Sequence, residues 1–237
     1  MEGLISKVKQ NKQIDFVLTD RHRSDLELLL NGGFFPLDTF NNENDYNLIL
    51  DKMELSDGTI WPIPITLDLT SKFINDNSIK VGSILSLREK EGFLNATLKI
   101  SEIWKIDKAR EANSVYGTND RKHPGVSYLY DVMGDYYISG DLTKIALPKH
   151  YDYTELRHSP KQLKEKFKQM KWDKVVAFQT RNPMHQAHKE IALKAANDSN
   201  ANLLIHPVVG PTKPGDIDHF TRVRCYKKIL KYFPENS

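Results

Sequence analysis

Much of the structural information in this sequence lies in Val175-Val-Ala-Phe-Gln-Thr-Arg-Asn-Pro-Met-His-Gln-Ala-His188, where an apolar run leads into polar and basic side chains. Val175 to Phe178 is short, β-branched and aromatic, which predicts a buried strand. Pro183 and the helically spaced apolar residues after it predict a helix whose first turn lies near His185. Parallel sheets bind ligands at the carboxyl ends of their strands, where the free N–H groups of a helix start attract anions.

The turn between this strand and helix carries side chains suited to binding an oxyanion. Arg181 brings a permanent positive charge and a planar fork of donors that matches a tetrahedral oxyanion. Three neutral neighbours can hydrogen-bond and fix the orientation of the bound group: Gln179, Thr180 and Asn182. The same residue types also fit a polar loop that does no more than cap a core helix.

Two histidines lie at the start of the predicted helix. His185 and His188 share one helix face, so both imidazoles can donate hydrogen bonds to charge that develops as a phosphoanhydride breaks. In the alternative, neighbours satisfy both rings, because an H-x-x-H pair alone is a weak motif. A zinc site would need further ligands, for which His206 and His219 are the nearest candidates, and no cysteine pair or H-E-x-x-H segment accompanies them. We therefore expect no metal site.

Patterns in the first two thirds of the chain are mainly strand-like. Alternating apolar residues predict strands at 61–67 and 94–100. One helix interrupts them, with Ser24 and Glu27 as a capping box at its start and Gly32 at its end. We predict a small, β-rich, barrel-like domain with one or two helices.

Helices and strands alternate in the last third of the chain. Ser159-Pro160 opens a lysine-rich helix that is expected to reach about Lys171. After the strand and helix of 175–188, a second buried strand is expected at Asn202 to His206 and a last helix from about Phe220 to Tyr232. This succession predicts the start of a doubly wound parallel sheet. Two strands make such a sheet incomplete, so we expect an exposed apolar edge and a tendency to associate.

The segment before the last helix follows the second strand and should lie on the same rim as the 175–188 turn. Lys213 could add positive charge for a bound polyphosphate, and Asp216 or Asp218 could hold a water on magnesium. A rigid Pro/Gly turn with solvated charges is the alternative. The sequence has no G-x-x-x-x-G-K-[ST] segment, which argues against a P-loop.

Composition indicates a globular protein and gives little support for nucleic-acid binding. Hydrophobic residues are 39% and charged residues 27% of the 237, and the formal net charge is +3. No apolar run is long enough to span a membrane and the N-terminus does not resemble a signal peptide, so we expect a cytoplasmic protein. The single cysteine, Cys225, excludes an internal disulfide and is expected to be a buried packing residue.

Several long segments occur in an order typical of one enzyme family. Phe178 to His188 is followed by Leu204-Ile-His-Pro-Val-Val-Gly210 and by Thr212-Lys-Pro-Gly-Asp-Ile-Asp-His219. Shorter segments precede them: Leu30-Asn-Gly-Gly-Phe-Phe-Pro-Leu37, Asp57-Gly-Thr-Ile-Trp-Pro-Ile-Pro-Ile-Thr-Leu67 and Gly134-Asp-Tyr-Tyr-Ile-Ser-Gly140. Together these segments resemble the ATP sulfurylases, also called sulfate adenylyltransferases.

The resemblance implies an α/β protein with two domains. A β-rich, PUA-like barrel would occupy residues 1–158. Residues 159–237 would form the first part of a Rossmann-like, doubly wound nucleotidyltransferase domain. The family's second active-site loop contains Gly-Arg-Asp-His, which this sequence lacks. We therefore expect the chain to be the front part of a longer enzyme and its activity alone to be doubtful.

The resemblance also implies the reaction of ATP with sulfate to give adenosine 5′-phosphosulfate (APS) and pyrophosphate. The residues implied for substrate binding and catalysis are Gln179, Thr180, Arg181, Asn182, His185 and His188. The glutamine and arginine would grip sulfate, the threonine and asparagine would orient the nucleotide, and the histidines would stabilise the developing charge. Because both reactants are anions, positioning and charge neutralisation must supply the catalysis.

Magnesium is expected to arrive with ATP, and a full-length member is expected to form a homo-oligomer. Two other hypotheses remain open. One is an H-x-x-H nucleotidyltransferase that uses a different acceptor. The other is a non-catalytic module that binds RNA or a partner through its β-rich domain, although the weak net charge argues against RNA.

Overall fold

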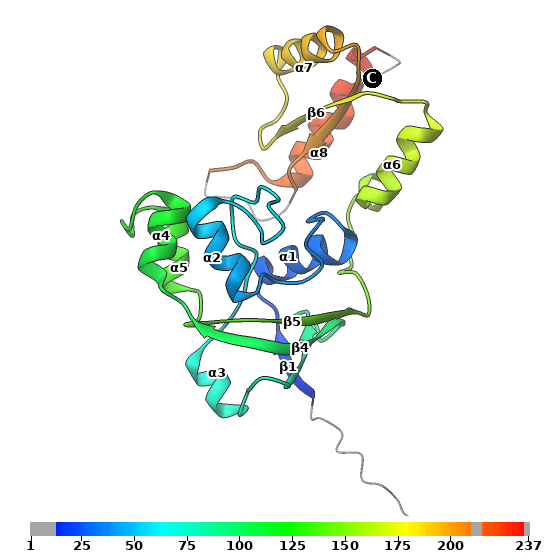
Figure 1. Ribbon diagram of the computed structural model, residues 1–237. Coiled ribbons are helices and arrows are strands. Elements are labelled where there is room, and N and C mark those ends of the chain that lie inside the picture. The colour runs from blue at the N-terminus through cyan, green and yellow to red at the C-terminus, as the bar shows by residue number, and fades with distance from the viewer. Residues whose placement is uncertain (1–12, 210–214, 235–237) are drawn as a thin grey trace, which may run out of the picture. The chain divides into compact units, whose positions relative to one another are not determined.

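Each element of the computed structural model belongs to one of two units, Met1–Ser159 or Pro160–Ser237 (Figure 1). The structure describes residues 13–209 and 215–234. Strands and helices occur in both units, so the expected α/β class is confirmed. The first unit has a mixed sheet, whereas the second has a parallel pair of strands.

Unit 1 is organised by a five-stranded sheet with the order β1-β3-β4-β5-β2. Figure 1 labels β1, β4 and β5 of this sheet. The strands are β1 (Gln13–Val17), β2 (Leu67–Leu69), β3 (Ile84–Arg88), β4 (Leu94–Lys105) and β5 (Tyr136–Lys144). β1 runs parallel to β3, and the other neighbours are antiparallel. The main core lies on this sheet, where the side chains of Leu85 and Leu87 in β3 and of Leu98 in β4 are fully buried. A Cβ on Gly140 would lie 2.0 Å from the Lys99 carbonyl oxygen, so the β4–β5 pairing requires glycine there.

Five α-helices accompany the sheet in the described part of unit 1, so the expectation of one or two was wrong. They are α1 (Asp20–Asn31), α2 (Glu43–Lys52), α3 (Ser71–Asp76), α4 (Lys108–Tyr116) and α5 (Pro124–Asp131), with a 3₁₀ turn at Thr154–Leu156. Most are short and begin at a single polar cap. Asn42 accepts a hydrogen bond from the Asp45 amide at the start of α2, and Asp107 does the same for Arg110 at α4. A single capping residue is a weak sequence signal, so a short helix that begins with one is easily mistaken for a loop.

The capping box expected in the first helix was also wrong. α1 begins before Ser24, at Asp20, where the Thr19 hydroxyl accepts from the His22 amide at 3.2 Å. Ser24 lies inside the helix, and its hydroxyl donates to the Asp20 carbonyl oxygen at 2.9 Å. Gly32, with φ 81°, ends the helix as predicted.

One of the two predicted strands is confirmed. The segment 94–100 lies within β4, whereas 61–67 is irregular until Leu67. Pro62 and Pro64 explain the difference, because neither has an N–H group to donate to a sheet. The strand that follows them is short, and it lies at the sheet edge beside β5.

A second cluster in unit 1 surrounds a buried carboxylate. Glu111 of α4 accepts hydrogen bonds from the hydroxyls of Tyr46 and Tyr137, each at 2.9 Å. Trp104 packs against both tyrosine rings, with ring centroids 5.8–5.9 Å apart. Burial raises the pKa of Glu111, and the two tyrosine hydrogen bonds oppose that rise. Polar and aromatic side chains therefore join α2, α4 and the sheet.

Unit 2 has the expected succession of elements. They are α6 (Pro160–Gln169), β6 (Val175–Thr180), α7 (Gln186–Asp198), β7 (Asn202–Pro207) and α8 (His219–Ile229), with a 3₁₀ turn at Leu230–Tyr232. β6 pairs in parallel with β7, and α7 contacts both strands. The start of a parallel, helix-connected sheet is therefore confirmed.

The expectation that both strands of unit 2 are buried was wrong. No residue of β6 is buried, and Leu203 is the buried residue of β7. In the described residues each strand has one neighbour, so the apolar runs of both strands stay half exposed. The small core of this unit consists of Met184, Ala192, Ala196, Leu203, Tyr226 and Phe233.

Candidate active site

The turn after β6 is held by hydrogen bonds from three directions. The Thr180 carbonyl oxygen accepts from the Val208 amide at 3.0 Å, which continues the pairing with β7. The Thr180 hydroxyl accepts from the Asn182 amide at 3.1 Å. The Tyr226 hydroxyl, on α8, donates to the Asn182 carbonyl oxygen at 2.8 Å. The backbone on both sides of Arg181 is therefore fixed.

Arg181 pairs with an acidic residue that lies far from it in the sequence. Its Nη2 is 2.9 Å from Oδ2 of Asp216, and the two side chains are 40% and 23% exposed. Within the described residues, the other guanidinium N–H groups make no hydrogen bond. The pair thus orients the guanidinium and leaves most of its donors available to an oxyanion.

Both aspartates considered for a magnesium-bound water have protein partners in the structure. Asp216 holds Arg181, and Asp218 is the N-cap of α8, where Oδ1 accepts from the Thr221 amide at 2.9 Å. That backbone hydrogen bond lowers the pKa of Asp218. Lys213, the expected phosphate contact, lies outside the described residues.

The two histidines of the H-x-x-H pair lie together, as predicted. His185 is the N-cap of α7 with an extended backbone, and its side chain makes no capping hydrogen bond. Its ring stacks on that of His188, with centroids 3.7 Å apart and planes at 25°. His188 also contacts the Phe178 ring, at 5.8 Å between centroids. Its Nδ1 is buried and has no hydrogen-bond partner in the described part of the chain.

The remaining candidate, Gln179, occupies an exposed position near the end of β6, in register with His206 of β7. Gln179 and the five other candidates therefore all lie within one strand end, one turn and one helix start. The unpaired N–H groups of the α7 N-terminus add partial positive charge to that place. The arrangement can bind a multiply charged oxyanion.

Two residues of the site were not found from the sequence. Arg222 is 1% exposed, and its Nη1 and Nη2 donate to the carbonyl oxygens of Val208 and Ile217, the latter at 2.7 Å. Tyr226, one turn later on α8, holds the Asn182 carbonyl. The sequence signal that could have revealed them is their i, i+4 spacing, which places both residues on the same face of the last helix.

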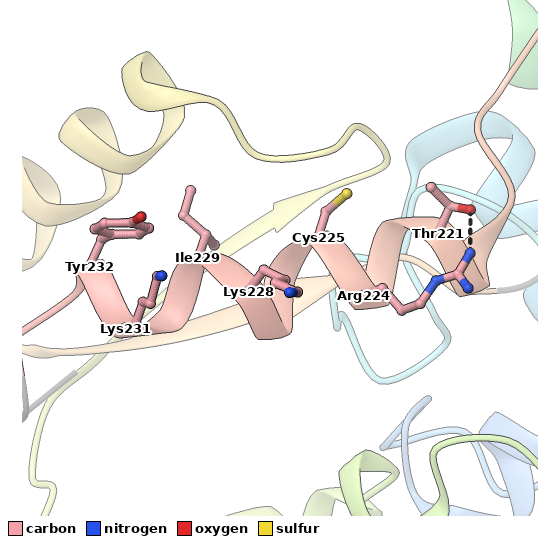
Figure 2. Close-up of a pocket in the computed structure, with 7 residues that line it drawn as sticks. All are labelled: Thr221, Arg224, Cys225, Lys228, Ile229, Lys231 and Tyr232. Atoms are coloured by element: carbon pink, nitrogen blue, oxygen red, sulfur yellow. Dashed lines mark hydrogen bonds between the residues drawn. The ribbon is translucent and has the colours of Figure 1, made fainter.

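Cys225 was expected to be buried, and the structure corrects this. It is half-buried and lines an open pocket of about 440 Å³ along α8. Figure 2 shows the lining residues Thr221, Arg224, Cys225, Lys228, Ile229, Lys231 and Tyr232. None of the predicted site residues is among them. Packing of α8 places Val223 and Tyr226 inward, which leaves position 225 at the margin.

The described residues contain neither a metal-binding cluster nor a membrane-spanning helix. Over residues 13–209 and 215–234, no three His, Cys, Asp or Glu side chains gather in a way that could hold a metal ion. His206 and His219 therefore do not complete a metal site with the histidine pair. Among the described helices, none has the length and apolar character needed to cross a membrane.

Comparison with known proteins identifies both parts of the chain. Residues 3–147 match the PUA-like domain family, and residues 154–237 match the ATP-sulfurylase family. The sulfate adenylyltransferase of Saccharomyces cerevisiae is 49% identical over 231 residues, which are 98% of this chain and 45% of that protein. That of Mycosarcoma maydis is 46% identical over 221 residues, 93% of this chain and 38% of that protein.

One solved structure supports the fold. A hexameric APS kinase from Thiobacillus denitrificans matches with a TM-score of 0.75 and 30% identity, over 94% of this chain and 40% of that one. The present chain thus spans less than half the length of these relatives. Its first domain is PUA-like, as expected, and the chain belongs to the ATP-sulfurylase family.

Proposed function

We propose that this chain supplies the oxyanion-binding part of a sulfate adenylyltransferase active site. One observation carries the proposal: Arg181, the 180–182 turn and the stacked His185–His188 pair follow one another between the end of β6 and the first turn of α7. The names of the relatives, which match almost the whole chain, support the same reaction. The enzyme would be a nucleotidyltransferase that converts ATP and sulfate into APS and pyrophosphate.

The proposed reaction brings two anions together. A sulfate oxygen attacks the α-phosphorus of ATP, and the new S–O–P linkage forms as the bond to the bridging oxygen of pyrophosphate breaks. Pyrophosphate leaves with that electron pair, so no covalent enzyme intermediate is needed. Gln179 and Arg181 hold sulfate, Thr180 and Asn182 orient the nucleotide phosphates, and the histidine pair donates to the charge on the departing group.

The Arg181–Asp216 pair is compatible with this role. Asp216 accepts from one nitrogen of the guanidinium, and its side chain is partly exposed rather than buried in a closed site. A bound sulfate would meet the remaining donors of the same planar fork. The carboxylate then keeps the guanidinium aimed while sulfate binds from the open side.

The proposal extends to the domains and to the other participants. Residues 1–158 form the PUA-like domain and residues 159–237 the first part of the catalytic domain. Magnesium reaches the site as part of MgATP, with no resident metal on the protein. The hexameric assembly named for the Thiobacillus denitrificans protein supports a homo-oligomer for the full enzyme.

A chimera tests the whole reaction. The 231 matching residues of the Saccharomyces cerevisiae relative are replaced by this chain, and pyrophosphate release from ATP is measured with sulfate, phosphate or no acceptor. We expect sulfate-dependent release. Release that prefers another acceptor would instead identify a different H-x-x-H nucleotidyltransferase, and a folded chimera without any release would contradict the proposal.

Arg181→Ala in that chimera tests the site itself. Loss of a donor aimed at developing charge is expected to lower turnover by about 100-fold or more. Arg224→Ala is the matched control, because this arginine is exposed on α8 and donates to the nearby Thr221 hydroxyl. Circular dichroism should show the same fold for both variants. Normal sulfate-dependent turnover in Arg181→Ala would refute the assignment.

A further inference from the structure

A buried arginine joins the two ends of the segment that leads from β7 to α8. Arg222 donates to the carbonyl oxygen of Val208, just after β7, and to that of Ile217, just before α8. Its side chain is fully buried, and in the described residues it has no acidic partner. Its Nε is buried without a hydrogen-bond partner in the described residues, so the two Nη donors must offset the cost of burying the charge. Both carbonyls are therefore held by charge-assisted hydrogen bonds.

The next polar residue on the same helix face holds the other side of the site. Tyr226 is 4% exposed, and its hydroxyl donates to the Asn182 carbonyl oxygen at 2.8 Å. Burial raises the pKa of Tyr226, which keeps the phenol protonated and able to donate. Arg222 and Tyr226 are one helical turn apart, so α8 presents both donors in one direction.

These two contacts lie beside the two partners of an ion pair. Ile217 directly follows Asp216, and Asn182 directly follows Arg181. The pair itself is partly exposed, and ion pairs of this kind contribute little free energy, so the carboxylate alone holds the guanidinium only weakly. Buried hydrogen bonds to the adjacent backbone can keep it in one geometry.

We propose that Arg222 and Tyr226 are positioning residues for Arg181. From one face of α8 they fix the backbone next to Arg181 and next to Asp216, and this aims the guanidinium at the bound oxyanion. The inference rests on the proposed function, in which that guanidinium binds sulfate. Neither residue touches the substrate.

The hydroxyl of Tyr226 allows a mild first test. In the 237-residue chain, Tyr226→Phe is compared with Tyr232→Phe, whose ring lies on the same C-terminal segment but is 61% exposed. Titration calorimetry with APS measures the affinity. Because the lost hydrogen bond is buried, we expect Tyr226→Phe to bind about 3- to 10-fold more weakly. Tyr232→Phe should bind like the unmodified chain.

A double-mutant cycle separates positioning from general stability. If Tyr226 acts through Arg181, then Tyr226→Phe should change APS affinity much less in an Arg181→Lys background than in the unmodified chain. A residue with a merely structural role would weaken binding equally in both backgrounds. Equal effects would therefore overturn the proposal even if Tyr226→Phe binds weakly.

Arg222 is tested with the exposed Arg224 as its matched control. Arg222→Met should weaken APS binding more than Arg224→Met does, and Arg222→Lys should restore part of the loss because it keeps a charged donor without the planar fork. If Arg222→Met fails to fold, the proposal is judged on Arg222→Lys and Tyr226→Phe. Unchanged affinity in both of those variants would overturn it.

Hydrogen exchange distinguishes failure of this inference from failure of the proposed function. If the unmodified chain does not bind APS, the proposed function fails for the chain. Exchange of the Asn182 amide, which donates to the Thr180 hydroxyl, still reports the turn. Faster exchange in Tyr226→Phe than in Tyr232→Phe would support positioning of the turn by α8, and equal exchange would overturn it.

Discussion

The two units of this protein are stabilised in different ways. In unit 1, all three residues of β2 are buried, and β3 and β4 contribute Leu85, Leu87 and Leu98 to the same core. In unit 2, β6 has no buried residue, and the site backbone is held by Arg222 and Tyr226. Unit 1 therefore relies on apolar burial, whereas the binding rim of unit 2 relies on a few directed hydrogen bonds. Such a rim can adjust to a ligand without disturbing a large core.

Buried ionisable groups sharpen this contrast. Two of the buried carboxylates in unit 1 have pKa values that move in opposite directions: that of Glu111 is raised and that of Asp68 is lowered. Asp68 accepts from His22 Nε2 and from the Gly134 amide, each at 2.7 Å. In the described part of unit 2 the buried charged group is the guanidinium of Arg222, which donates to carbonyl oxygens. The charges of unit 1 join elements of the scaffold, whereas that of unit 2 supports the site.

The largest effect should come from matched leucine truncations. Leu98→Ala removes a fully buried side chain from β4 and should lower the free energy of unfolding by about 3–5 kcal/mol. Leu204→Ala, on the half-buried β7, should cost about 1–2 kcal/mol because less surface leaves the interior. Urea denaturation measures both. Equal losses would break the distinction between the two units.

Asp68→Asn should give the next largest effect. Burial opposes ionisation, but the His22 and Gly134 hydrogen bonds outweigh it and lower the pKa of Asp68. We expect the free energy of unfolding of the variant to be about 2–3 kcal/mol lower near pH 7, because one acceptor and the charge are removed. Because the pKa of Asp68 is lowered by folding, its charge stabilises the folded state at pH values above the pKa of the unfolded state, which is about 3.9. This stabilisation is lost as the pH falls through the pKa of the folded state. If the free energies of unfolding of the unmodified chain and the variant differed by the same amount from pH 7 to pH 3, this expectation would be contradicted.

Glu111→Gln should show the opposite pH dependence. Because burial raises the pKa of Glu111, the unmodified chain gains stability from the protonated carboxyl at low pH. Relative to the variant, its free energy of unfolding should be highest below about 4.3, the ordinary glutamate pKa, and should fall as the pH rises through the raised value. At pH 4 the free energies of unfolding of the unmodified chain and the variant should differ by less than about 1.5 kcal/mol. Denaturation midpoints over pH 4–8 provide the measurement.

The smallest stability change is expected at the binding rim. Asp216→Asn should alter the free energy of unfolding by less than about 1 kcal/mol, because the pair with Arg181 is partly exposed and asparagine keeps an acceptor there. Asparagine still accepts from Arg181 but no longer repels an anion, so APS should bind about 3-fold more tightly. Asp216→Ala removes the acceptor and should bind more weakly than Asp216→Asn. The reverse order, measured by calorimetry, would show that Asp216 does not orient Arg181.

The sequence by itself determined the strand, turn and helix of 175–188, the closeness of His185 and His188, and the family. These features depend on neighbouring residues, since periodicity and close spacing already place side chains on one face. The short helices α2 and α4 escaped notice because one polar cap is a weak local signal.

Tertiary structure alone decided which partners complete the site. The Arg181–Asp216 contact joins residues 35 positions apart, and the Tyr226–Asn182 contact joins residues 44 apart. No local pattern specifies such pairs, because they exist only after α8 has packed on the rest of unit 2. The same packing buried Arg222 and left Cys225 half-buried. The sequence of the helix alone does not show this, because an arginine is usually exposed and a cysteine is usually buried.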